Sequence, residues 1–294
     1  MSRFSTIDMS KLPRPTTYRS THEGILAARM DYLVAKLRAA GVAYDVGALE
    51  ADPAKILQEA DAYRELLNLQ AIDDAVMQRS LAYASGDNLD VVAADYGTVR
   101  AEGESDSSLR ARAQLAWEAL SRGGSYGGYE YEARTAAPLE LSDVAVYGHE
   151  VEGVALGEVR IVCLGANASG APSAAVLQRV RDRFPRAARK VNDLLNVVAA
   201  TSATYTIDAT LTLRAGADAP AVVAAQVARL DAYCLARRAI AESVTLGGVV
   251  AALGHDDAGV VVDVDLRAPL ARVGGGPFEA PVCVGRRVVW EIAA

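Results

Sequence analysis

The composition of this chain is that of an acidic globular protein. Its 294 residues are 51% hydrophobic, and 37 acidic against 30 basic side chains give a formal net charge of −7. That apolar content is ample for the core of one large domain or of two to three ordinary ones. The acidic balance excludes nucleic acid as the main partner, because nucleic-acid binders carry dense positive charge.

The sequence also disfavours membrane insertion and metal binding. The N-terminal stretch lacks an apolar signal-like segment, and no run of the chain approaches the roughly 20 apolar residues of a membrane span. The three cysteines, Cys163, Cys234 and Cys283, lie too far apart for a zinc motif or a disulfide framework, and we interpret them as small apolar fillers. We therefore expect a soluble protein that starts out in the cytoplasm and holds no cofactor.

Two long helices are predicted near the N-terminus. A capping box that begins at Ser20 opens the first, which ends at Gly41. Asp52 caps the second, which runs to about Ala84 and is on the order of 45 Å long. Such a length is typical of helices that bridge or pack against partners. Each helix carries an apolar stripe, at Leu26, Met30, Leu33 and Leu37 on the first and at Ile56, Ala60, Tyr63 and Leu67 on the second.

Two shorter helices complete a predicted helical N-terminal region over residues 1–137. Gly97 ends the first of them, and Asp106 is expected to cap the second. Their apolar faces are Leu89, Val92 and Tyr96 on the first and Leu109, Ala113, Ala116 and Leu120 on the second.

The rest of the chain has the texture of strands and predicts an α+β fold with two small, mainly antiparallel α/β modules. The central module, 138–202, has the order β-β-α-β, with its helix over roughly 173–189. The C-terminal module, 203–294, has the order β-α-α-β-β. Its first strand alternates, and we expect one inward face at Tyr205, Ile207, Ala209, Leu211 and Leu213.

A G-x-S-x-G pattern between the helical region and the strands raises the question of a serine hydrolase. Asp143 and His149 follow Ser125 in the chain order that such enzymes use. A nucleophile elbow, however, needs a strand before its serine, and here a helix precedes it. The glycines at 123–124 are therefore interpreted as a helix C-cap and Ser125 as the N-cap of the next helix.

Other conspicuous clusters have structural interpretations. We read the residues at 255–257, His-Asp-Asp, as a solvated turn, and the glycines at 274–276 as a flexible hairpin loop. The basic run at 179–190 is interpreted as the wet face of a helix whose arginines pair with acidic patches at an interface. The large aromatic residues serve as core or interface anchors, namely Trp117, Tyr126, Tyr129, Tyr131 and Trp290.

One segment, 81–133, carries a set of residues whose order and spacing are those of a known family. They are Tyr83, Ala84, Gly86, Leu89 and Asp90, then Tyr96, Gly97 and Arg100, then Asp106, Leu109, Arg110 and Arg112, and the turn from Gly124 to Tyr129. In these residues the chain resembles the baseplate J-like family of contractile phage tails, and the arrangement of the remaining chain agrees with that family.

The resemblance implies a structural, non-enzymatic wedge subunit of a tail baseplate, without cofactor. Such a subunit forms the ring around the central hub by self-association and by contacts with other wedge, hub and sheath-proximal proteins, and takes part in the change that triggers sheath contraction. It is a late protein, assembled in the host cytoplasm and located in the virion. The implied interface or fold residues are Leu89, Asp90, Tyr96, Gly97, Arg100, Asp106, Arg110, Arg112, Gly124 and Tyr129, of which the charged ones are candidates for salt bridges. A serine hydrolase using Ser125 and a sugar-binding tail-tip adhesin are the alternatives.

Overall fold

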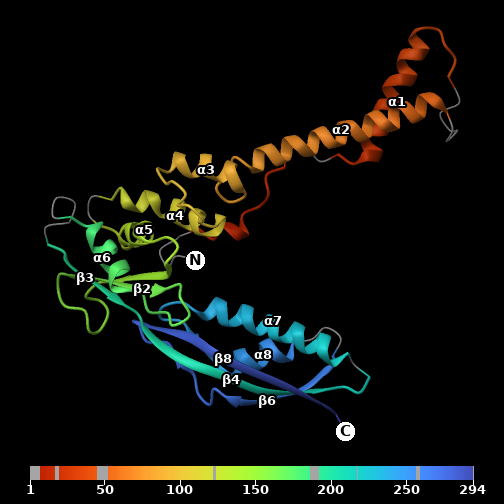
Figure 1. Ribbon diagram of the computed structural model, residues 1–294. Helices are drawn as coiled ribbons and strands as arrows, with labels where there is room; N and C mark the ends of the chain where they lie inside the picture. Colours follow the sequence, from red (N-terminus) through yellow and green to blue (C-terminus); the bar gives the residue numbers. More distant parts are fainter. Residues whose placement is uncertain are drawn as a thin grey trace. The chain divides into compact units, whose positions relative to one another are not determined.

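The structure divides into two compact units, and its α+β class is the one the sequence predicts. The computed structural model describes residues 7–16, 20–44, 52–121, 124–185, 192–216, 218–255 and 259–293. One unit takes in the described residues as far as Arg100, and the other begins at Ala101. Figure 1 shows the elements of each. The predicted division into 1–137, 138–202 and 203–294 stays a prediction.

Helices make up the regular structure of the first unit, as predicted for the N-terminal region. They are η1 (Met9–Lys11), α1 (His22–Ala39), α2 (Pro53–Met77) and α3 (Gly86–Asp95). The N-cap of α1 is Thr21 and not Ser20, because the Thr21 hydroxyl is the one that accepts the Gly24 amide, at 3.2 Å. Asp52 caps α2 as predicted.

The second helix is shorter than its sequence pattern predicts. α2 has 25 residues and a length of about 38 Å, and it ends at Met77 well before Ala84. Turns follow it, and Ser80 accepts the amide of Ala82 through its hydroxyl at 3.4 Å. Serine competes in this way with helical hydrogen bonding, which explains the early end.

The second unit opens with two helices that pack on a three-stranded sheet. The elements are α4 (Asp106–Ala119), α5 (Tyr126–Ala136), β1 (Leu141–Tyr147), β2 (Glu158–Gly165), α6 (Ala174–Asp182) and β3 (Leu194–Ala199). The strand order is β1-β2-β3, antiparallel in the first pair and parallel in the second. Residues of α5 and α6, such as Ala133 and Val180, share one core with the inner face of this sheet. α6 ends at Asp182, short of the predicted 189, since Pro185 follows closely.

The second sheet follows directly along the chain. Its elements are β4 (Thr201–Leu213), α7 (Ala219–Arg237), β5 (Ser243–Val244), α8 (Leu246–Gly254), β6 (Val261–Ala268), β7 (Val273–Gly274) and β8 (Glu279–Ile292). The order β6-β4-β8 combines an antiparallel and a parallel pair, and β5 and β7 form a separate short ladder. The five residues predicted to face inward on β4 are all buried. α7 and α8 cover that face in Figure 1.

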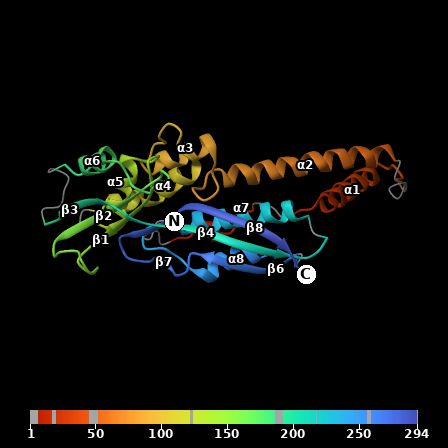
Figure 2. The ribbon, with the colours of Figure 1, turned by 60° about the horizontal axis from the view of Figure 1, so that its bottom comes forward.

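Both sheets are mixed, whereas the sequence predicts mainly antiparallel ones. In the first sheet, β3 returns parallel to β2 because α6 crosses between them. Figure 2 shows β3 running on into β4, so the two sheets share one continuous path of backbone. A joint core, which includes Val162, Ala200 and Ile240, packs between them.

Candidate functional site

The first half of the family motif forms the end of α3. Leu89 is fully buried, and Tyr96 is the C-cap residue of the helix. Gly97 follows in the left-handed region at φ +69, and its amide donates to the Ala94 carbonyl at 2.9 Å. A residue with a Cβ adopts that conformation only with strain, so glycine here is a requirement of the turn.

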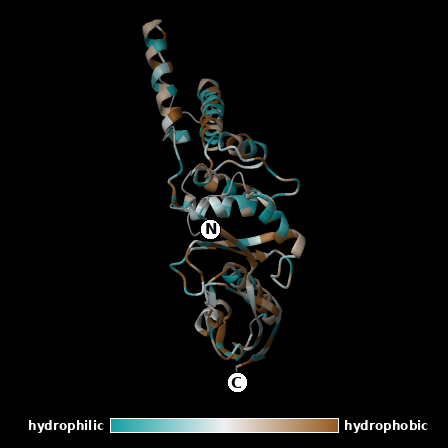
Figure 3. Ribbon diagram, turned by 90° about the vertical axis from the view of Figure 1, so that its left-hand side faces the viewer, coloured by the Kyte–Doolittle hydropathy of each residue, from teal (hydrophilic) through white to brown (hydrophobic). Residues whose placement is uncertain are grey.

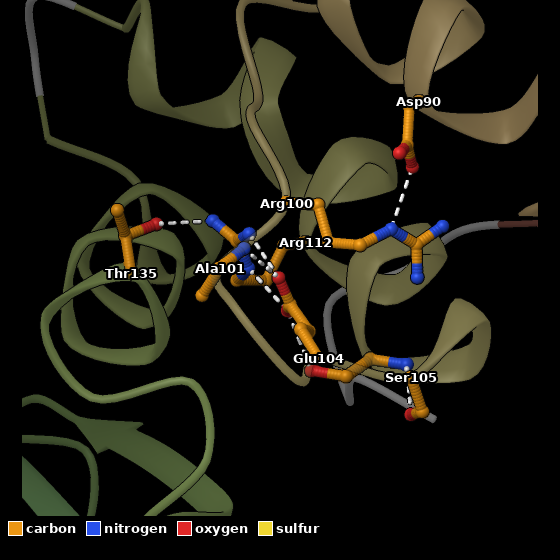
Figure 4. Close-up of polar contacts among 8 residues, drawn as sticks. Asp90, Arg100, Ala101, Glu104, Ser105, Arg112 and Thr135 are labelled. Carbon is orange, nitrogen blue, oxygen red and sulfur yellow. Dashed lines mark hydrogen bonds and ion pairs between the residues drawn. The ribbon is translucent and has the colours of Figure 1, made fainter. Parts of the chain in front are cut away.

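Arg100 ties the chain that leaves this turn back to α3. Its Nε donates to Asp90 Oδ1 at 2.6 Å (Figure 4). Its Nη2 donates to the Gly86 carbonyl at 3.4 Å. The Arg100 and Asp90 side chains are 21% and 42% exposed. Ion pairs of such exposure contribute about 1 kcal/mol or less, so this one mainly fixes the geometry of the turn.

The second half of the motif contains a buried ion pair between Arg112 and Glu104. Two parallel bonds join them, Nε to Oε1 at 2.8 Å and Nη2 to Oε2 at 2.6 Å, and their side chains are 4% and 0% exposed (Figure 4). The carboxylate also accepts from the Ala101 amide at 3.0 Å and the Ser108 hydroxyl at 2.8 Å, while Arg112 reaches Thr135 on α5 at 3.4 Å.

The electrostatics of Glu104 follow from these bonds. Burial by itself raises the pKa of its carboxyl, but the hydrogen bonds from Arg112, Ala101 and Ser108 outweigh burial and leave the pKa below its usual value. Glu104 is a motif residue that the sequence analysis missed. It lies eight positions before Arg112 and outside α4, so helical spacing gives no signal for the pair.

Asp106 and Arg110 lie one turn apart at the start of α4. The N-cap is Ser105, whose hydroxyl accepts the Ser108 amide at 3.3 Å, so the prediction that Asp106 caps the helix is wrong. Asp106 occupies the first turn, where its charge favours the helix dipole. A registry-fixing role for Asp106 and Arg110 stays a prediction. At the other end, Leu120 is 72% exposed and does not continue the buried face.

The G-x-S-x-G stretch forms a tight junction between α4 and α5. Ser125 is the N-cap of α5, as predicted: its hydroxyl accepts the Gly128 amide at 3.1 Å and donates to the Glu118 carbonyl at 3.0 Å. Gly124 has φ +80, while Gly123 lies outside the described residues. A Cβ at Gly128 would stand 2.8 Å from the Glu118 carbonyl oxygen, so glycine permits the close approach of the two helices.

Tyr129 anchors the same junction to the core. It is 8% exposed and stacks at a tilt on Phe184, with 5.5 Å between ring centroids. Its hydroxyl donates to the Asp193 carboxylate. Burial, followed by that hydrogen bond, raises the pKa of the tyrosine hydroxyl, which keeps it protonated.

The proposed members of a catalytic triad have other partners. Ser125 and His149 do line one open hollow of about 270 Å³. Asp143, however, accepts from Arg134 at 2.8 Å through Oδ1 and from the Ile240 amide at 2.9 Å through Oδ2. Asp143 therefore helps to connect the two sheets. The hydroxyl of Ser125 caps α5. The geometry favours structural roles for both residues.

The remaining sequence-predicted clusters are also occupied by contacts within the chain. Arg181 donates to the Val197 carbonyl at 2.9 Å, and Arg183 pairs with Glu132 at 2.8 Å. The end of the basic run and the aspartates after His255 lie outside the described residues. Within the described ranges, no group of three metal-ligating side chains occurs. The helices described there include none that is long and apolar enough to cross a bilayer.

α2 carries a row of exposed apolar residues in the described chain, here called the α2 stripe. α1 packs against the side of α2 that holds the buried Ala62, and Arg29 fixes the pair through Asp61 at 2.8 Å and Glu65 at 2.7 Å. The α2 stripe lies about 100–160° around the helix from Ala62. In Figure 3, hydrophobic and hydrophilic residues alternate along the long helices. The large members of the α2 stripe are Ile56, Tyr63 and Leu67, which are 50%, 56% and 45% exposed.

Comparison with known proteins identifies the family. The baseplate J-like N-terminal domain matches residues 50–103, which include α2, α3 and the first half of the motif. Baseplate protein J of Escherichia phage P2 is 33% identical over 303 residues, which cover 96% of this chain and 97% of that protein. The match therefore extends through both sheets, and the chain belongs to the baseplate J-like family of phage tail proteins.

Proposed function

We propose that this member of a phage baseplate family is a wedge subunit of a contractile tail. Several copies surround the central hub, contact one another and other wedge, hub and sheath-proximal proteins, and take part in the change that triggers sheath contraction. The protein acts in the virion after assembly in the host cytoplasm, and its role is structural.

The observation that carries this proposal is the α2 stripe. Its three large side chains lie in a row on one helix face and are each about half exposed. The buried residues of α1 and α2 within the described chain are Ile25 and Ala62, which is little for a hairpin with 43 helical residues, 18 in α1 and 25 in α2. Helices of a bundle bury such rows against further helices, and exposed apolar rows mark sites of protein association.

A structural role also agrees with the chemistry of the motif. Ser125 caps a helix and Asp143 joins two sheets, so the residues of the hydrolase alternative already stabilise the fold. A baseplate needs interfaces with two packings close in free energy, which requires contact surfaces and no active site.

The test compares the capture of tail proteins by two variants that each add one negative charge at neighbouring positions of α2. A tagged chain is recovered from phage-producing cells, and the co-purifying chains are identified by mass spectrometry. Leu67→Glu places a charge in the stripe, whereas Asn68→Glu places the same charge one position along, on a different exposed face. We expect the unchanged chain and Asn68→Glu to recover other tail proteins in stoichiometric amounts, and Leu67→Glu to lose part of them.

Two outcomes would contradict the proposal. Recovery of the unchanged chain alone, from cells shown to be making tails, would reduce the family relationship to a shared fold. Full recovery by Leu67→Glu would remove the α2 stripe from the interface. Labelling by a fluorophosphonate probe that disappears in Ser125→Ala would instead support the hydrolase.

A further inference from the structure

Two half-buried cysteines meet between α7 and β8. Cys283 is the Cα partner of Tyr205 in the β4–β8 ladder, and a β-bulge follows, since the next pair is Thr206 with Gly285. Opposed residues in a ladder point to the same face, and Tyr205 belongs to the core beneath α7. Cys234, on α7, packs against that same core, as does Cys283. The fold thus brings together two thiols 49 positions apart in sequence, 234 to 283.

The two thiols interact directly and differ in reactivity. The hydrogen bond between them holds the pKa of the Cys283 thiol below its usual range and raises the pKa of the Cys234 thiol. The Tyr205 hydroxyl also bonds to Cys234. A thiolate is the nucleophile in disulfide exchange, so Cys283 is the member suited to attack. Cys163 differs from both, because it is fully buried in the first sheet and burial raises its thiol pKa to about 12.

We propose that Cys234 and Cys283 are a redox-active pair that closes into a disulfide linking α7 to β8. The oxidant is a small disulfide such as glutathione disulfide. The Cys283 thiolate attacks one of its sulfurs, which breaks the oxidant's S–S bond and releases one glutathione. Cys234 then displaces the second glutathione from Cys283 and forms the protein's S–S bond. The pair loses two electrons to the oxidant, and its two protons end on the two glutathione thiols.

The bridge would fasten one element of the second sheet to the helix that covers it. Between the two cysteines the chain forms α8, β6 and the short ladder strands, so oxidation restrains most of this half of the unit. Thiol-rich surroundings keep such a pair reduced, and thiol-poor surroundings allow it to close. The inference that the pair closes in a finished tail outside the host rests on the proposed function. Formation of the disulfide itself depends only on residues of this chain.

The test uses the full chain with Cys163→Ala, so that only the two thiols of the pair remain. The protein is equilibrated in glutathione buffers from fully reduced to fully oxidised, trapped with N-ethylmaleimide, digested and analysed by mass spectrometry. We expect both thiols to disappear together, with a peptide that joins Cys234 to Cys283 within one chain and no retained glutathione. The melting temperature should rise by roughly 5–10 °C and fall back with dithiothreitol.

Single variants separate the two steps. Cys234→Ser should stop after the first step and retain one glutathione on Cys283, whereas Cys283→Ser should react far more slowly at Cys234. The proposal is overturned if both thiols stay free in every buffer or if disulfides form only between separate chains. It is also overturned if the chain with both Cys234 and Cys283 retains glutathione on Cys283.

Discussion

The two units of this chain differ in how they cover their apolar residues. In the second unit the inward residues of β4, such as Ile207 and Leu211, are at most 6% exposed beneath α7 and α8. In the first unit α1 covers one side of α2 and leaves Tyr63 and Leu67 about half exposed. The second unit thus buries this row within the chain, while the first unit leaves the α2 stripe exposed, and we propose that stripe as an assembly surface. A periodic row of apolar residues therefore does not by itself say whether the chain buries it.

Two ion pairs of the motif, one in each unit, also differ in burial. Arg112 and Glu104 are buried and fully bonded in the second unit, whereas Arg100 and Asp90 lie partly in solvent in the first. Breaking a buried pair leaves an uncompensated charge in a medium of low dielectric constant. Breaking an exposed one leaves both groups to water.

The largest expected effect is therefore the loss of Arg112. Arg112→Ala leaves the Glu104 carboxylate buried without its guanidinium partner, and we expect a loss of about 3–5 kcal/mol in the free energy of unfolding. Urea unfolding, followed by circular dichroism, measures it. Arg100→Ala is the matched variant of the first unit and should cost about 1 kcal/mol or less. Equal losses would contradict the contrast between the two pairs.

The pH dependence of stability sharpens this prediction. In the folded protein the pKa of Glu104 is lowered from 4.5, so the folded state binds fewer protons than the unfolded state as pH falls through that range. Its contribution to stability is fully present above pH 4.5 and is lost as pH falls through the folded pKa. In Arg112→Ala, burial still raises the pKa of the Glu104 carboxyl, but the hydrogen bonds from Arg112 no longer lower it. Acid should therefore destabilise the variant less, relative to its own stability at neutral pH. An unchanged difference between the two proteins from neutral pH to acid would contradict the assigned cause.

A second prediction makes the same substitution in both units. Leu211→Ala removes a fully buried side chain and should cost about 2–5 kcal/mol, whereas Leu67→Ala removes a side chain that is 45% exposed and should change the stability of the isolated chain by about 0.5 kcal/mol or less. Thermal or urea unfolding measures both. A comparable cost at Leu67 would mean that the chain itself covers the α2 stripe.

Sequence reasoning succeeded where one local pattern has one physical cause. The alternation from Tyr205 to Leu213 predicted the inner face of β4, and the hydroxyl of Ser125 after a glycine turn predicted the cap of α5. The family was recognised from the motif in segment 81–133, and a relative that is 33% identical over 96% of this chain confirms it. Capping failed where adjacent polar residues compete: Thr21 takes the place expected for Ser20, and Ser105 that of Asp106.

Features that depend on tertiary contacts had no local signal. Alternating residues look the same in parallel and antiparallel strands, so the parallel pairing of β4 with β8 follows from the connections and not from the pattern. Glu104 meets Arg112 because the chain turns before α4, and neither residue reveals the other by spacing. The α2 stripe was visible as a periodic row, but periodicity does not say which surface covers it.

The smallest predicted effects compare two helix caps, one in each unit. Thr21 and Ser125 each accept an amide at the third position of their helix, Gly24 and Gly128, so alanine at either site should cost about 1 kcal/mol. Ser125→Ala also frees the Glu118 carbonyl, which places it at the upper end of the range of about 0.5–2 kcal/mol. Because the units are compact separately, Thr21→Ala should lower only the unfolding transition of the first and Ser125→Ala only that of the second, as hydrogen exchange resolved by residue would detect. A loss of protection spread over both units by either variant would show that they unfold as one, and the α1–α2 hairpin would then draw its stability from the rest of the chain.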